Sequence, residues 1–387
     1  MDDKGNPKDI IENILKSRLT KDLNFDSGKI LGSMCTRPHP FAKDIFSQYI
    51  EKNIGDPGLV NSTEKLEKEA INMIGKLLSL KNAYGYIVTG GTEANILALW
   101  TARNYAGAKP GIGEVIVPES CHFSFDKIGD LLCLKIIKIS LTDKFQIDIK
   151  KVKQAITPRT VALVGVAGTT SLGAVDPIKK LSEIAEEHGI YLHIDAAFGG
   201  YVLPFLKDLG FPSPPFNFKL KGVRSITIDP HKMGMGVIPG GGIIYRNPEM
   251  VEKAKFPVSY LAGGENALPT IVGTRSGASV LSVWALLKHL GKSGYKTIVR
   301  RCMDLTFMLA EKIKEMKSVD LVMWPVINIV GIKSDSLNIK DIAFGLRKRG
   351  WAISLFKEHI RIVIMPHLYS DHIASFTDDL KKVVDEL

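Results

Sequence analysis

The run from Val161 to Val166 most constrains the fold, because it is almost wholly apolar. A β-strand of this composition is expected to be covered on both faces. The run lies within an alternation of strand and helix patterns, which predicts an α/β domain with a mostly parallel central sheet. Ligands of such a sheet bind in the loops that follow the carboxyl ends of its strands. The other predicted strands are 86–88, 115–117, 135–139, 191–194, 225–228 and 241–245, with a helix over 93–106.

The length of 387 residues is enough for one large domain and a smaller one. We expect an N-terminal arm over residues 1–55, a large domain over 56–285 and a small α+β domain over 286–387. A weak helical pattern in the arm places Ile10, Ile11, Ile14 and Leu15 on one face.

Three local patterns give further expectations. Asn61 followed by Glu64 resembles a capping box at the start of a helix. Asp176 before Pro177 predicts a second capped helix, with Gly189 just past its end. The stretch 256–273 contains Gly263, Gly264 and Pro269 and predicts a mobile loop.

The charge and the cysteine content limit the classes of function that the chain can have. The chain has 51 lysine and arginine residues against 41 aspartate and glutamate residues, a net charge of +10, and the basic residues are scattered. No nucleic-acid-binding motif accompanies them, so we expect a lysine-rich surface or a site for an anionic ligand rather than a nucleic-acid interface. The four cysteines are far apart and lack metal-ligand spacing, which is typical of reduced thiols in the cytoplasm, and we expect no metal. No apolar window is long enough to predict a membrane span.

Lys232 follows a predicted strand that is stopped by Pro230, and a glycine-rich turn comes next. A scaffold can direct a side chain in such a loop into a cleft. With His231 beside it, Lys232 is a candidate Schiff-base nucleophile. The alternative is an ordinary solvated lysine.

The segment Thr89–Asn95 lies between a predicted strand and a predicted helix. Its glycines, including Gly91, allow backbone N–H groups to approach a phosphate, and the helix N-terminus favours the negative charge. Thr92 adds a hydroxyl donor. The alternative is a tight turn without a ligand.

Asp195 ends another predicted strand and should face the same cleft. A carboxylate there can keep a ring nitrogen protonated, and Ala197 leaves room for a flat ring; the alternative for Asp195 is a helix N-cap. His122 also follows a strand and either stacks on that ring or serves the loop. Thr169 and Thr170 are alternatives for contacting a phenolic oxygen, or cap the next turn.

A phosphate loop, an aspartate, a stacking histidine and a Schiff-base lysine together suggest pyridoxal phosphate (PLP). With these motifs in this order, the chain resembles the group II PLP-dependent decarboxylases of fold type I, and within them the archaeal L-tyrosine/L-aspartate decarboxylases. The resemblance covers nearly the whole chain. The motifs that carry it are Gly55–Leu59, Gly90–Asn95, Ala167–Thr170, Asp195–Gly200, Asp229–Gly234 and Gly273–Arg275.

The resemblance implies a role for each of several residues. Lys232 would bind PLP covalently, Asp195 would hold the pyridine nitrogen, and His122 and Ala197 would lie on the two faces of the ring. The phosphate contacts would come from Gly91, Thr92 and His231, the phenolic-oxygen contact from Thr170, and a contact with the neighbouring subunit's phosphate from Gly273 and Thr274. Such enzymes are homodimers with active sites at the interface, and the N-terminal arm would wrap the partner.

Two further residues are candidates for substrate chemistry. Related enzymes donate a proton from a tyrosine on a mobile loop, a role for which Tyr260, His122 and Lys232 are the candidates here. Arg361 is the candidate for pairing with the substrate carboxylate; its alternative is a surface salt bridge.

The resemblance implies decarboxylation of an L-amino acid. L-Tyrosine would give tyramine for methanofuran synthesis, and L-aspartate would give β-alanine for coenzyme A synthesis, with tyrosine slightly preferred. A PLP lyase of the sphingosine-phosphate type is the alternative, although those enzymes usually carry a membrane anchor. A nucleic-acid-binding protein is suggested by the charge alone.

Overall fold

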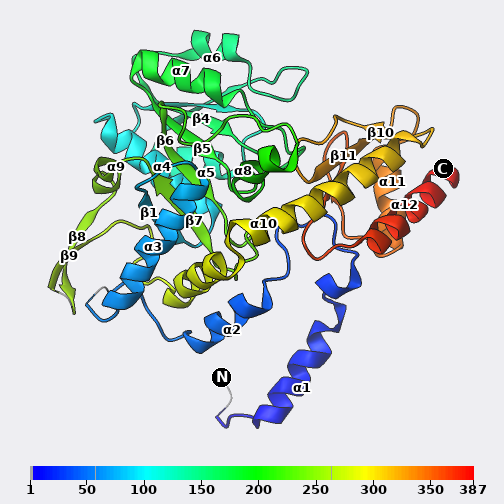
Figure 1. Cartoon of the computed structure of the whole chain (residues 1–387), viewed down its shortest axis with the longest axis horizontal. Helices are drawn as coiled ribbons and strands as arrows, with labels where there is room; N and C mark the ends of the chain where they lie inside the picture. Colours follow the sequence, from blue (N-terminus) through cyan, green and yellow to red (C-terminus); the bar gives the residue numbers. More distant parts are fainter. Residues whose placement is uncertain (1–2, 57, 263) are drawn as a thin grey trace.

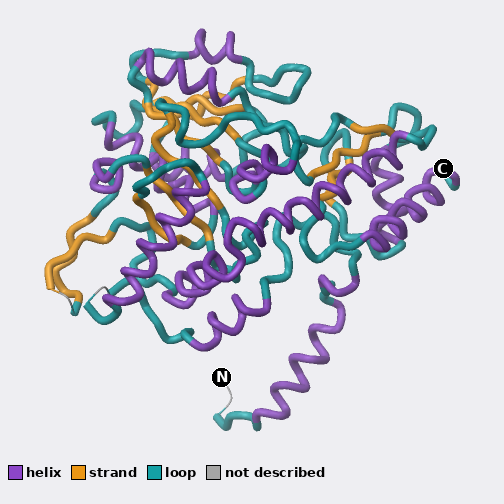
Figure 2. Tube along the Cα trace, viewed as in Figure 1, coloured by secondary structure: helices purple, strands orange, loops and turns teal. Residues whose placement is uncertain are grey.

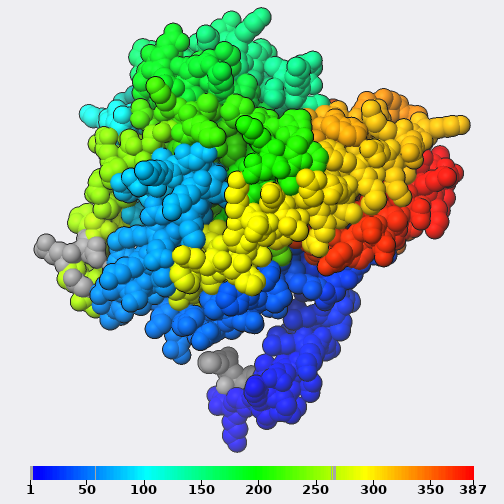
Figure 3. Space-filling view, viewed as in Figure 1, coloured from blue at the N-terminus to red at the C-terminus, as the bar shows by residue number. Residues whose placement is uncertain are grey.

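The computed structural model describes residues 3–56, 58–262 and 264–387. Pro57 and Gly263, which belong to two of the segments singled out above, lie outside the described residues. A large α/β body is joined by the long helix α10 (Gly277–Lys314) to a smaller unit at the C-terminus (Figure 1). Figure 3 shows helix α1 (Lys8–Arg18) projecting from this body.

The central sheet of the large body has seven strands in the order β1-β7-β6-β5-β4-β2-β3. The pairs among β2 to β6 are parallel, and only β7 runs antiparallel to its neighbours, so the prediction of a mostly parallel sheet is confirmed. The strands are β1 (Tyr84–Val88), β2 (Glu114–Pro118), β3 (Lys135–Ile139), β4 (Thr160–Val166), β5 (Tyr191–Asp195), β6 (Val223–Ile228) and β7 (Gly241–Tyr245).

Apolar cores lie on both faces of this sheet. Leu163 packs into one core, and Val164, the next residue along β4, packs into the other. Strand β4 is therefore buried on both sides, as its composition predicts. The covering helices are α3 (Asn61–Leu77), α4 (Gly91–Tyr105), α5 (Ser124–Leu132), α6 (Ile149–Ala155), α7 (Ile178–His188), α8 (Leu203–Leu206) and α9 (Pro248–Glu252).

The C-terminal unit is an antiparallel sheet in the order β10-β11-β13-β12, packed with helices. Its elements are β10 (Asp320–Leu321), β11 (Ile329–Lys333), α11 (Ile339–Lys348), β12 (Ser354–Leu355), β13 (Ile360–Val363) and α12 (Ser370–Asp385). The N-terminal segment joins this unit, because the amides of Leu31 and Gly32 donate to the carbonyl of Ala352. In the chain, α2 (Pro40–Gln48) and the 3₁₀ turns Leu19–Lys21 and Phe25–Ser27 precede the large body. Two further 3₁₀ turns, Gly199–Tyr201 and Lys207–Leu209, lie within it.

Three local expectations are wrong. Asn61 is the first residue of α3 rather than its cap, and the N-cap, Val60, has no side-chain hydrogen bond. Asp176 does not cap α7, because its two carboxylate oxygens accept hydrogen bonds from the amides of Ile147 and Val166, both at 2.8 Å. The stretch predicted as a mobile loop forms a hairpin of β8 (Phe256–Leu261) and β9 (Gly264–Leu268), which projects at the edge of the body (Figure 2).

In the part of the chain that the structure describes, no helix combines the length and the apolar character that a membrane span requires.

Candidate active site

A cavity of about 380 Å³ opens at the carboxyl ends of the parallel strands and brings most of the predicted site residues together. Its wall comes from the loops after β1, β2, β4, β5 and β6, which is the edge where an α/β sheet binds ligands. The predicted residues that line it are Gly91, Thr92, His122, Thr170, Asp195, Ala197, His231 and Lys232.

Lys232 forms a buried ion pair with a residue that sequence reasoning did not assign. Its Nζ lies 3.1 Å from Oδ2 of Asp229, whose side chain is 1% exposed. Burial by itself lowers the pKa of Lys232, but the charges of Asp229 and Asp195 outweigh it and the pKa is raised. The lysine is therefore an ammonium ion held in place against Asp229. The spacing of Asp229 and Lys232, three residues apart in one turn, was the signal that could have revealed this pair.

Asp195 is held from two sides. Its Oδ1 accepts a hydrogen bond from the amide of Ala197 at 3.1 Å, and its Oδ2 accepts one from Nδ2 of Asn95 at 3.1 Å. The alternative role as a helix N-cap is wrong, because the following 3₁₀ turn begins at Gly199 and its N-cap is Phe198. The carboxylate instead lies in the wall of the cavity.

A fully buried polar cluster lies behind Asp195. The Oδ1 atom of Asn95 is 3.0 Å from Nε2 of His193 and accepts a hydrogen bond from the hydroxyl of Thr227 at 2.7 Å. Nδ1 of His193 is 2.8 Å from the hydroxyl of Ser225. Asn95 belonged to a motif singled out in the sequence, but its position within the helix gave no sign of this contact.

His193 should make stability depend on pH. Burial lowers its pKa from 6.5 to about 4, against the opposing effect of Asp195. A depressed folded-state pKa stabilises the native state above the unfolded pKa, and this stability is lost as the pH falls towards 4. At about 1.4 kcal/mol for each pH unit, the loss is about 3 kcal/mol.

We therefore expect the advantage in unfolding free energy of the wild type over His193→Gln to shrink by about 3 kcal/mol between about pH 7.5 and pH 4. Urea unfolding across this range, followed by circular dichroism, measures it. A constant difference between the two proteins would show that His193 titrates alike in the folded and unfolded states.

The N-terminus of α4 forms a cradle in the cavity. A Cβ atom on Gly91 would lie 2.9 Å from Asp229 Oδ2 and 3.2 Å from the Cβ of Ala197, so only glycine fits at this point. The carboxylate of Glu93 holds the preceding turn by accepting hydrogen bonds from the amide and the hydroxyl of Thr89, both at 2.8 Å. Helix N-termini of this kind bind phosphate.

Unpartnered polar atoms next to this cradle fit the same ligand. Among the described residues, Nδ1 of His231 and Oγ of Ser120 are buried without a hydrogen-bond partner, and both residues line the cavity. Burial lowers the pKa of His231, so the ring can supply a neutral N–H donor. Together with Asp195 and Lys232, these donors fit the phosphate, ring nitrogen and aldehyde of PLP.

The structure separates the alternatives for the remaining cavity residues. Thr169 is 1% exposed and its hydroxyl accepts a hydrogen bond from the amide of Ala174 at 3.0 Å, so it holds a turn, whereas Thr170 lines the cavity. His122 lines the cavity beside Phe123, with ring centroids 4.1 Å apart. Burial lowers the pKa of His122 despite the charge of Asp195.

Four predicted residues do not line this cavity: Tyr260, Gly273, Thr274 and Arg361. Tyr260 lies on β8 with 85% of its surface exposed. Their expected roles therefore stay predictions, and for Gly273 and Thr274 the expected role involves a second subunit.

The segment Gly273–Thr274 is held by a buried ion pair. Arg275 Nη1 and Nη2 lie 2.7 Å and 3.1 Å from the two carboxylate oxygens of Glu67, and both side chains are buried. A Cβ on Gly55 would lie 2.0 Å from the carbonyl oxygen of Gly273, so the Gly55 motif supports the same segment. These contacts give the exposed segment a fixed base.

We expect Glu67→Gln to lower the unfolding free energy by about 3 kcal/mol, because it leaves the buried charge of Arg275 without its partner. Chemical denaturation measures the change. Glu64→Gln is the matched control, since Glu64 pairs at 2.7 Å with the exposed Lys68 on the same helix, and such a pair contributes less than about 1 kcal/mol. Equal losses in the two variants would contradict the expectation.

Arg361 is a buried cation. Only 6% of the residue is exposed, and its guanidinium donates hydrogen bonds to the carbonyls of Thr170 and Gly32 and to the hydroxyl of Ser354, at 2.6 to 2.8 Å. No acidic side chain pairs with it among the described residues, and its Nε has no partner. The alternative role in a surface salt bridge is therefore wrong. Burial lowers the pKa of Arg361 to about 10, which still leaves the group charged at neutral pH.

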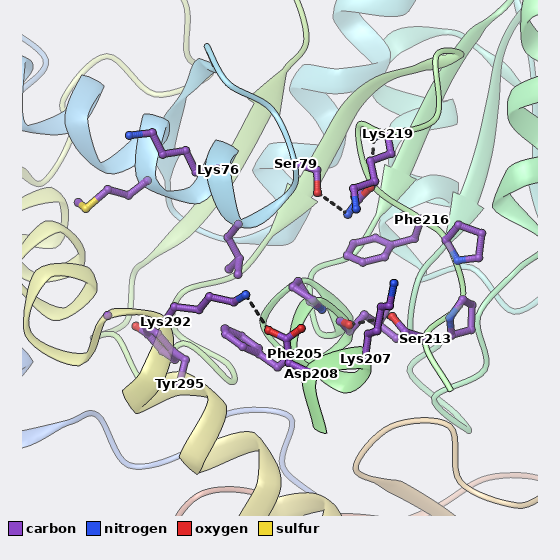
Figure 4. A pocket seen from close by; sticks show the side chains of 18 of the residues that line it. Lys76, Ser79, Phe205, Lys207, Asp208, Ser213, Phe216, Lys219, Lys292 and Tyr295 are labelled. Carbon is purple, nitrogen blue, oxygen red and sulfur yellow. Dashed lines mark hydrogen bonds and ion pairs between the residues drawn. The ribbon is translucent and has the colours of Figure 1, made fainter. Parts of the chain in front are cut away.

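A larger cavity of about 580 Å³ lies elsewhere on the body and contains none of the predicted site residues (Figure 4). Its rim carries Lys207 and Lys219, and Lys292 pairs with Asp208 at 2.7 Å. The hydroxyl of Tyr295 donates to the carbonyl of Gly234 at 3.0 Å, and this contact supports the loop that carries Lys232.

Comparisons with known proteins show the family to which the chain belongs. Residues 35–333 match the model of the pyridoxal-dependent decarboxylase conserved domain. The chain is 49% identical to a probable L-aspartate decarboxylase of Pyrococcus abyssi, over 99% of this chain and 98% of the relative. It is 43% identical to a probable L-tyrosine/L-aspartate decarboxylase of Methanosphaera stadtmanae, over 100% of both chains.

The solved structure of a sphingosine-1-phosphate lyase from Burkholderia pseudomallei superimposes with a TM-score of 0.92 at 26% identity, covering 100% of this chain and 92% of the other. Because the fold is so similar, the lyase reaction remained an alternative from sequence alone. The family match and the archaeal relatives instead support decarboxylation. The chain is a PLP-dependent amino-acid decarboxylase and belongs to the pyridoxal-dependent decarboxylase family.

Proposed function

We propose that this enzyme converts L-aspartate to β-alanine as its main reaction and L-tyrosine to tyramine as a secondary one. The slight preference for tyrosine drawn from the sequence changes here, because the relatives named as L-aspartate decarboxylases are more similar than those named for both substrates. A cavity of about 380 Å³ that receives both cofactor and substrate also favours the smaller amino acid.

The environment of Arg361 is the observation that supports a substrate with a carboxylate group. A charged side chain in the protein interior is normally paired, because an unpaired buried charge is strongly unfavourable. Arg361 has only neutral acceptors around it among the described residues. One of them is the carbonyl of Thr170, a residue of the cavity wall. We propose that the missing counter-charge is the α-carboxylate of the substrate.

PLP, when bound, supplies a ring that accepts the electron pair released as the bond from the α-carbon to the carboxylate breaks. The chain's own residues prepare this step. Asp195 would pair with the ring nitrogen and Arg361 would orient the carboxylate that leaves, while Met34, Phe123 and Phe198 line the cavity. His122 and Lys232 line the cavity and are therefore the candidate proton donors. Tyr260 of the same chain is exposed and lies outside the cavity.

We also propose a homodimer with shared active sites. Helix α1 buries none of its residues, and its apolar face exposes Ile10, Ile11, Ile14 and Leu15. Burial of such a face against a second copy would stabilise the pair. The Gly273–Thr274 segment, fixed by Arg275, would then reach the partner's phosphate. Sedimentation of the full chain and of a variant lacking residues 1–28 tests this arrangement.

A substrate panel on the PLP-loaded enzyme tests the reaction. L-Aspartate, L-tyrosine and L-glutamate are supplied separately, and carbon dioxide and amine are both quantified. Dominant β-alanine supports the proposal and a place in coenzyme A synthesis, whereas dominant tyramine would point to methanofuran synthesis and overturn the order of substrates. Absence of carbon dioxide, with cleavage of a phosphorylated long-chain amino alcohol to an aldehyde, would favour the lyase.

A further inference from the structure

The donor and acceptor roles in the cluster behind Asp195 follow from its chemistry. The carboxylate of Asp195 only accepts, so Asn95 presents its Nδ2 to it at 3.1 Å and turns its Oδ1 to the other side. That oxygen also only accepts, so His193 carries its hydrogen on Nε2, 3.0 Å away. Nδ1 of His193 then accepts from the hydroxyl of Ser225 at 2.8 Å. One arrangement thus satisfies the whole chain of hydrogen bonds with a neutral histidine.

The elements that carry these groups meet at the cofactor cavity. His193 and Asp195 are two residues apart on β5 and therefore point to the same face of the sheet. Helix α4 covers that face, and its first turn forms the phosphate cradle while Asn95, one turn later, reaches Asp195. Asn95 is 1% exposed and His193 is fully buried.

We propose that Asn95, held in place by His193, is a positioning residue that fixes the ionised carboxylate of Asp195 towards the pyridine nitrogen of the cofactor. Both carboxylate oxygens already have a donor, Ala197 for Oδ1 and Asn95 for Oδ2, so the group cannot rotate freely. The inference rests on the proposed function, in which Asp195 pairs with the ring nitrogen.

The test uses the full-length apoprotein and two ligands. One is PLP, and the other is the analogue in which carbon replaces the ring nitrogen; both retain the aldehyde and the phosphate. We expect Asn95→Ala and His193→Leu to weaken PLP binding about tenfold or more, since each disturbs a charge-assisted hydrogen bond, and to change binding of the analogue less than about twofold. His193→Gln, which can present an amide N–H to Asn95, should restore most of the preference for PLP.

Thr101→Val is the matched control. Thr101 is a fully buried residue of the same helix, but its hydroxyl is 3.1 Å from that of Tyr245 rather than near Asp195. It should leave the ratio of the two affinities unchanged. Equal weakening of both ligands in the Asn95 and His193 variants, or unchanged PLP binding, would overturn the inference.

Circular dichroism shows whether Asn95→Ala folds; if it does not, the comparison of His193→Leu with His193→Gln decides. Substrate and product do not enter the measurement. A protein that shows the expected ligand selectivity but releases no carbon dioxide would therefore support this inference while overturning the proposed function.

Discussion

Replacement of Lys232 by alanine should reduce turnover about 10⁴-fold, equivalent to about 5 kcal/mol in the activation barrier. Lys232 lies in the cavity wall and supplies the only amine nucleophile among the residues that line it. Its Nζ is already directed by the ion pair with Asp229 at 3.1 Å. Without that amine the cofactor cannot be bound covalently, and the route through covalent catalysis is lost.

The absorbance of the cofactor–lysine link and the rate of carbon dioxide release are the two measurements. Lys232→Arg is a second variant that keeps a positive charge opposite Asp229 but lacks a nucleophilic amine, so it should be inactive while remaining folded. Lys219→Ala, on the rim of the larger cavity, is the control and should retain activity. Steady turnover in both Lys232 variants would refute the assignment.

The architecture could be predicted from the sequence wherever burial alone determines the pattern of apolar residues. Strand β4 is almost wholly apolar because both of its faces are covered. The candidate phosphate cradle, Asp195 and Lys232 could also be predicted from the sequence, because each lies at or just after the end of a strand and carries a residue type suited to the expected ligand. The carboxyl ends of parallel strands meet at one edge, so the topology brings these motifs together.

Local cap signals failed where a tertiary contact competed for the same side chain. Asp176 precedes a helix, yet two buried amides from earlier in the chain, those of Ile147 and Val166, donate to its carboxylate. Its environment raises its pKa to about 6 by burial, opposed by those hydrogen bonds. A short-range pattern cannot contain the partner 29 residues away, so the sequence predicted the helix but assigned the wrong task to the aspartate.

The residues that support the site could not be predicted from the sequence for the same reason. Asn95 and His193 are 98 residues apart in the chain, and their contact depends on the packing of α4 against β5. Neither residue type is unusual at its position in a helix or a strand. Candidate ligand-binding residues can thus be predicted from motif order, whereas the residues that hold them in place follow only from the folded chain.

Arg361 shows how the structure sharpens such a prediction. Its guanidinium is fixed by neutral acceptors from three parts of the chain, Gly32, Thr170 and Ser354, which orient it without neutralising it. A preoriented buried cation of this kind binds a carboxylate strongly, because the desolvation of the guanidinium is already part of the folded state. We expect Arg361→Met to lower kcat/KM about 100-fold to 1,000-fold, equivalent to about 3 to 4 kcal/mol.

The product amine distinguishes recognition of the α-carboxylate from general support of the fold. It lacks the α-carboxylate, so its inhibition constant should change less than about threefold in Arg361→Met if the residue binds that group. Arg347→Met is the control, because its guanidinium also donates to a backbone carbonyl, that of Ile353 at 3.4 Å, but Ile353, unlike Thr170, does not line the cavity. Parallel losses in substrate turnover and amine binding would assign Arg361 to the scaffold, whereas a loss confined to the carboxylate-bearing substrate would identify the buried guanidinium as the group that orients the bond to be broken.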